Sequence, residues 1–185
     1  MRRILNWSMT VLSLLGCIFL SFNTLPGMNL FGITPNWLLI YLVAWSVKHS
    51  LVESAIAGLV MGSILDGLTA PERSHIVPFV VAAVVTVLIH RRIIKKMQEN
   101  FISLALIVFG MVILVEALQG LQFLSTHGTQ QALGLTEFWV YQQRAALSSA
   151  ILSSLWTPVL CLPLHYLWEQ VEPPRRPDYS GASIK

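Results

Sequence analysis

The chain has 185 residues and a mass of 20.6 kDa, the size of a single domain. Hydrophobic residues make up 55% of it and charged residues 11%, whereas a soluble domain carries about 25% charged residues. So few charges cannot cover a water-exposed surface, which excludes a soluble globular domain, a disordered chain and a fibrous repeat. The net charge of +3 comes from basic residues between apolar runs, which is typical of membrane-protein loops and not of a nucleic-acid-binding face.

Six apolar runs follow one another along the chain, and together they predict an all-α membrane protein. A membrane-spanning helix needs about 20 residues. The second and fourth runs are short, and Pro35 and Asn36 weaken the second. A bundle of six transmembrane helices is therefore the predicted fold, and five helices with a partly re-entrant second run is the alternative. The runs cover residues 4–25, 30–47, 51–68, 76–89, 101–124 and 145–168.

The domain organisation and the orientation follow from the same pattern. Residues 1–170 are predicted to form one transmembrane domain, and the proline-rich residues 171–185 a disordered cytoplasmic tail. If the N-terminus is cytoplasmic and six helices cross the membrane, ten of the 12 Lys and Arg residues lie inside. Only Arg73 and Arg144 then lie outside. This asymmetry predicts that both termini are cytoplasmic. The inner residues are Arg2, Arg3, Lys48, Arg91, Arg92, Lys95, Lys96, Arg175, Arg176 and Lys185.

The longest predicted loop covers residues 125–144, on the outer side before the sixth run. It contains an aromatic cluster at residues 136–141. Such a cluster is typical of an interfacial belt that anchors a helix. A docking surface for a partner outside the membrane is the other interpretation.

A stripe of two glycines and an acidic residue stands out in the third run. Gly58, Gly62 and Asp66 are spaced by four residues, so a helix places them on one face. Glycines at this spacing let another backbone come close. We expect Asp66 either to end this packing stripe as a polar cap, or to bind backbone N–H groups. In the second case it orders the outer loop 69–75 or contacts a partner.

A second polar stripe lies in the fifth run, at Glu116, Gln119 and Gln122. Ionisable groups at membrane depth are costly and normally face protein or water. This stripe predicts a polar seam between helices, with the wall of a small-molecule cavity as the alternative. No nucleophile with a base, no paired carboxylates and no metal-ligand spacing of histidines or cysteines occurs in the sequence. It therefore predicts no catalytic residue, no metal and no cofactor.

Two segments together carry a family resemblance. Pro35-Asn36-Trp37 leads into the second run, and the stripe of Gly58, Gly62 and Asp66 follows it. This arrangement resembles the MreD family, the rod shape-determining membrane proteins of bacteria. The resemblance covers about residues 1–170, including the six-run layout and a proline-bearing last helix.

The resemblance implies a non-enzymatic component of the cell-elongation complex in the bacterial inner membrane, supporting side-wall peptidoglycan synthesis. The partners it implies are an MreC-like protein, RodA, a class B penicillin-binding protein and, directly or through MreC, the MreB filament. It also implies a fold similar to the substrate-binding subunits of energy-coupling-factor transporters. A membrane subunit that binds a vitamin or a metal is therefore the alternative function. Such a subunit would need convergent polar groups at the outer ends of several helices.

Overall fold

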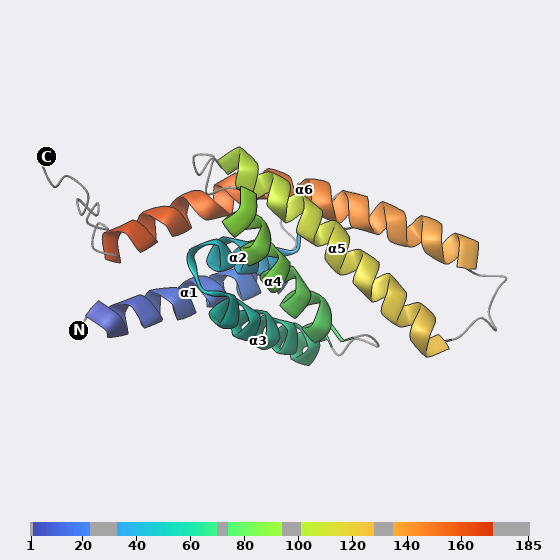
Figure 1. The fold of residues 1–185 in the computed structure, drawn as a ribbon, viewed down its shortest axis with the longest axis horizontal. Coiled ribbons are helices and arrows are strands. Elements are labelled where there is room, and N and C mark those ends of the chain that lie inside the picture. The colour runs from blue at the N-terminus through green and yellow to red at the C-terminus, as the bar shows by residue number, and fades with distance from the viewer. Residues whose placement is uncertain (1, 23–32, 70–73, 94–100, 128–134, 172–185) are drawn as a thin grey trace, which may run out of the picture.

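The computed structural model describes residues 2–22, 33–69, 74–93, 101–127 and 135–171, and these fold into six helices (Figure 1). The predicted all-helical fold with six helices is confirmed. The helices are α1 Arg2–Phe22, α2 Trp37–Lys48, α3 Leu51–Thr69, α4 Ile76–Ile93, α5 Phe101–His127 and α6 Leu135–Val171.

The helices differ in how far they could reach across a membrane. In the described part of the chain, three stretches are long and apolar enough to span it: Leu51–Thr69, Ile102–Phe123 and Trp139–Pro163. Two shorter apolar helices, Thr10–Ser21 and Trp37–Lys48, accompany them. Large apolar side chains remain exposed along the outer faces of α1, α3, α5 and α6. An apolar exterior of this kind is suited to lipid, so the protein is a multi-pass membrane protein.

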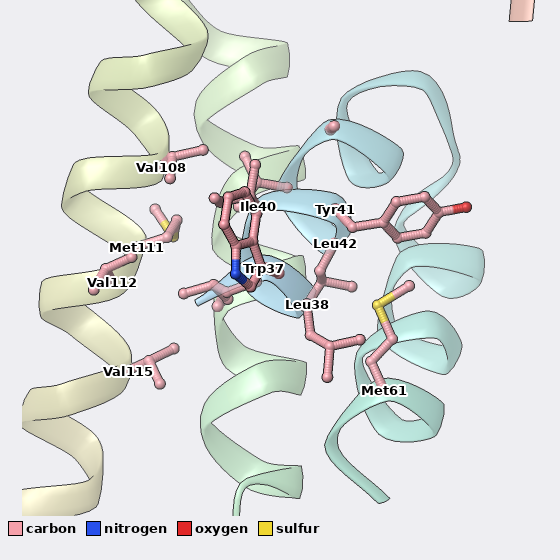
Figure 2. Close-up of a cluster of buried hydrophobic side chains, with 14 of the residues drawn as sticks. Trp37, Leu38, Ile40, Tyr41, Leu42, Met61, Val108, Met111, Val112 and Val115 are labelled. Carbon is pink, nitrogen blue, oxygen red and sulfur yellow. The ribbon is translucent and has the colours of Figure 1, made fainter. Parts of the chain in front are cut away.

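Helix α2 is the centre of the bundle. It packs against all five other helices, and nine of its 12 residues are buried. Figure 2 shows its side chains pointing outward in several directions, toward Met61 of α3 on one side and Val108, Met111 and Val112 of α5 on the other. A helix that is hydrophobic on every side is a buried helix. The free cysteines Cys17 of α1 and Cys161 of α6 are buried in the same core.

Helix α2 is shorter than its apolar run because of how it begins. The run starts near residue 30, but the helix begins at Trp37, directly after Pro35 and Asn36. The Asn36 side chain accepts a hydrogen bond from the Leu39 N–H at 3.1 Å, which makes Asn36 the N-cap. At about 1.5 Å per residue the helix is ~18 Å long, against a hydrocarbon layer of ~30 Å.

The remaining helices form two antiparallel hairpins and a single flanking helix. Helices α3 and α4 make one hairpin, α5 and α6 the other, and α1 packs against α2 and α6. The N-terminal end of α1 and the C-terminal end of α6 lie at the same end of the bundle, at the left of Figure 1. Helices α2 and α4 also run toward it and end in Lys48 and in Arg91 and Arg92. We call this the basic end, and the opposite one the Asp66 end.

The predicted loop at residues 125–144 is wrong. Helix α5 continues to His127, and α6 already begins at Leu135, so most of this segment is helical. Its polar residues resemble a loop by hydropathy, but Gln142 among them pairs with Glu116 across the α5–α6 hairpin. At 37 residues, α6 is ~55 Å long and exceeds the membrane thickness. The hairpin extends past the α3–α4 hairpin at the Asp66 end (Figure 1). The predicted tail lies almost wholly outside the described residues.

Candidate interaction sites between the helices

The stripe in α3 lies directly against the backbone of α4. A Cβ atom added to Gly58 would come within 2.8 Å of the Phe79 carbonyl oxygen, and one added to Gly62 within 2.7 Å of the Ile76 Cα. Both contacts are with main-chain atoms, which cannot rotate away as a side chain can. A side chain at either position would therefore force the two backbones apart, and glycine avoids this.

Ser54 extends the same stripe, and the sequence analysis did not include it. It lies four residues before Gly58 and is fully buried at 0% exposure. A third small residue at the same spacing was the signal that could have identified it. The buried residues of α3 are Ser54, Gly58, Met61 and Gly62, so the apolar residues on its other faces are turned outward.

Asp66 binds the segment that leads into α4. One carboxylate oxygen accepts hydrogen bonds from the backbone N–H of His75 and from its ring Nδ1, both at 2.7 Å. The other oxygen accepts one from the Ser74 hydroxyl, also at 2.7 Å. The Ser74 oxygen in turn accepts the Ile76 N–H at 3.2 Å, at the first residue of the helix. We call Asp66, Ser74 and His75 the Asp66 clamp.

Two effects stabilise the clamp: its hydrogen bonds to the Asp66 carboxylate, and the position of that charge at a helix end. Hydrogen bonds to a carboxylate are roughly twice as strong as those between neutral groups. The negative charge also lies at the N-terminus of α4, where the helix dipole stabilises an anion. The side chains of His75 and Asp66 are 18% and 20% exposed, so a partner can reach their edges. The clamp thus fixes the end of the α3–α4 hairpin and presents it at the surface.

The pairing of His75 with Asp66 was not predicted from the sequence. His75 has no ligand spacing in the sequence, yet the turn between α3 and α4 brings it to Asp66, nine positions earlier. The described residues contain no group of three or more His, Cys, Asp or Glu side chains that could hold a metal ion. The pair joins the end of α3 to the segment that begins α4.

The segment leading into α2 is fastened to α6. The backbone N–H of Asn36 donates to the Ser153 hydroxyl at 3.0 Å, and the Trp37 ring meets Trp156 edge-on, with centroids 5.8 Å apart. Pro35 is buried beside them. Ser153, 117 positions away in the chain, could not be chosen as a partner from sequence. These contacts hold the start of the central helix at a fixed position along α6.

In the polar stripe of α5, Glu116 contacts Gln142 of α6. Glu116 accepts a hydrogen bond from the Gln142 amide of α6 at 2.8 Å, and its backbone carbonyl lies 3.3 Å from the same nitrogen. Gln119 and Gln122 lie three and six residues further along α5 and are partly buried. Gln142 is the partner that the sequence analysis missed, since it lay in the segment assigned to a loop.

Comparison with known families agrees with this arrangement. The family model of the rod shape-determining protein MreD matches residues 1–168. The chain belongs to the MreD family. No curated protein and no solved structure matches it. The resemblance inferred from the two sequence segments is confirmed.

Membership of the MreD family assigns the chain a role in rod-shape determination and an association with the rod-shape complex. The family is a non-enzymatic, shape-determining family of membrane proteins. In this chain the polar contacts described above join one helix to another. Glu53 instead makes a local contact: it accepts the Ser50 N–H at 2.9 Å while its own N–H lies 3.4 Å from the Ser50 hydroxyl, a capping box that begins α3.

Proposed function

We propose that this MreD-family protein is a membrane scaffold of the elongation complex that binds its partners through surfaces held in place by interhelical contacts. The observation that carries this proposal is the Asp66 clamp, which joins α3 to α4 at a partly exposed end of the bundle. The partners are an MreC-like protein, RodA, a class B penicillin-binding protein and, directly or through MreC, the MreB filament. Through them the protein supports side-wall peptidoglycan synthesis.

The proposed topology is six spans in the bacterial inner membrane with both termini in the cytoplasm. Two observations support it: α1 begins and α6 ends at the same end of the bundle, and Lys48, Arg91 and Arg92 lie at that end. Reporter fusions after Lys48, after Lys96 and at the C-terminus should all give a cytoplasmic signal. A periplasmic signal at any of the three would refute this orientation.

The clamp is tested by Asp66→Ala and Asp66→Asn. Alanine removes all three hydrogen bonds, whereas asparagine keeps one acceptor oxygen and loses the charge. We expect Asp66→Ala to weaken co-purification with the MreC-like and synthase partners and to give rounded cells in a rod-shaped host that lacks its own MreD. Asp66→Asn should have a smaller effect.

The matched control is Thr69→Ala, one turn further along α3. The Thr69 hydroxyl donates to the Leu65 carbonyl of its own helix at 2.7 Å, so its loss should leave partner binding and cell shape unchanged. Thermal unfolding of each purified variant separates loss of folding from loss of binding. If Asp66→Ala is folded and still binds its partners, and a deletion strain instead loses uptake of a vitamin, the scaffold proposal is wrong and the transporter alternative is correct.

A further inference from the structure

Arg144 lies on the face of α6 that is turned away from the bundle. Gln142 faces α5, because it is hydrogen-bonded to Glu116 at 2.8 Å. Successive helix residues are rotated by about 100°, so Arg144, two positions on, lies roughly on the opposite side of α6. It is exposed, as are Tyr141 and Leu147, three residues before and after it, at 68% and 51%.

This face belongs to the apolar part of the helix. The stretch Trp139–Pro163 is hydrophobic enough to span a membrane, and Arg144 lies five residues inside its start, about 8 Å along the axis. Beyond Arg144 the same face continues with exposed Leu147, Ile151 and Leu155. A charge at this position is therefore next to lipid and needs a counter-charge.

Among the side chains that the structure describes, none supplies a counter-charge to Arg144. No ion pair joins it to a carboxylate among those residues. Glu116 is bonded to Gln142 on the other side of α6, and Asp66 is held in its clamp with His75 and Ser74. The exposed guanidinium can therefore take a partner from outside the chain.

The direction of the side chain indicates where this partner lies. Helical side chains point back toward the helix N-terminus, which for α6 is the Asp66 end. An arginine can lay its apolar stem along the helix and extend its guanidinium to the headgroup layer. Exposed Trp139 and Tyr141 one turn nearer that end are residues that prefer the same layer.

We propose that Arg144 binds the phosphate of an anionic phospholipid in the leaflet at the Asp66 end, with Tyr141 beside it. The planar guanidinium matches a phosphate with two parallel hydrogen bonds. A lipid is favoured over a carboxylate on a protein partner because the stripe below Arg144 is continuously apolar and exposed. The proposal is independent of the partners proposed above and of which leaflet faces the cytoplasm.

The test uses the full chain in nanodiscs that contain a photoactivatable phosphatidylglycerol, with the crosslink yield measured on the peptide that carries residues 139–147. We expect Arg144→Gln to lower this yield about five-fold, the factor corresponding to one basic residue near a charged membrane surface. Arg144→Lys should retain most of it. Arg92→Gln, an equal change of charge at the basic end, should leave it unchanged.

Competition on the unmodified protein provides a second measurement that does not depend on a variant folding. Unlabelled phosphatidylglycerol should displace the probe at about five-fold lower mole fraction than phosphatidylcholine. Equal competition by the two lipids, or an unchanged yield in Arg144→Gln, overturns the proposal. A crosslink from this face to an acidic helix of a co-purified protein also overturns it and assigns Arg144 to a protein interface.

Discussion

Replacing Gly62 by alanine tests the close approach of α3 and α4 most directly. The new Cβ would lie 2.7 Å from the Ile76 Cα, 3.0 Å from its N and 3.1 Å from the His75 carbonyl oxygen. Carbon atoms in ordinary contact are about 3.5–4.0 Å apart. The helices must therefore separate by about 1 Å at this point, next to the Asp66 clamp.

The expected cost combines two opposing terms. Overpacking of this kind destabilises a protein by about 1–3 kcal/mol. Alanine is favoured over glycine in a helix by about 1 kcal/mol, which offsets part of it. The net loss is about 0–2 kcal/mol, or a fall in Tm of up to roughly 8 °C for a chain of this size.

Gly67 in the same helix supplies the control. An added Cβ there meets nothing within 4 Å, so Gly67→Ala gains the helix propensity without the clash and should match or exceed the original Tm. Thermal unfolding in nanodiscs, followed by the loss of the monodisperse species on size-exclusion chromatography, ranks the two variants. If Gly62→Ala is as stable as Gly67→Ala, the two backbones are not in contact and the reasoning about the stripe fails.

Two further predictions concern the other interhelical contacts. Ser153→Ala leaves the partly buried Asn36 N–H without its acceptor and should cost about 1 kcal/mol, measured by thermal unfolding. Ser154→Ala should be nearly neutral, since that hydroxyl bonds only within α6, and equal losses for both variants would contradict the assignment. Glu116→Leu removes the carboxylate that accepts the Gln142 amide at 2.8 Å, leaves that amide only the 3.3 Å contact with the backbone carbonyl, and should lower the Tm. Glu116→Gln keeps a side-chain acceptor and should restore most of the stability. No difference between these two would show that the α5–α6 contact does not stabilise the hairpin.

Hydropathy was sufficient to predict the number of helices and most of their positions. A run of apolar residues shows that a helix lies in lipid or in the apolar interior of a bundle. This holds however the helices are packed against one another. The ends of helices depend on local chemistry instead. The start of α2 is set by the Asn36 cap inside an apolar run, so hydropathy alone placed it several residues too early. The start of α6 lies in a polar segment outside the apolar window, so hydropathy placed it too late.

For each contact in the candidate sites, the sequence identified one residue of the pair but not its partner. Small or acidic residues are unusual inside apolar runs, so the sequence alone marks Gly58, Gly62, Asp66 and Glu116. Their partners are ordinary residues whose importance comes from position in space. A serine in α6 or a glutamine in a presumed loop has no feature in the sequence that marks it as a partner, because the pairing depends on how the helices are placed.

Specific contacts between pairs of helices hold this bundle together. Lipid is as apolar as a leucine side chain, so burial of apolar surface does not by itself hold membrane helices in register. Here individual helix pairs each have a specific device: the glycine seam and the clamp for α3–α4, the Asn36–Ser153 bond for α2–α6, and the Glu116–Gln142 bond for α5–α6. Tyr41 adds a fourth, with its hydroxyl 3.1 Å from that of Ser13 on α1. A bundle fixed pair by pair in this way presents surfaces of constant shape, which the proposed scaffold function requires.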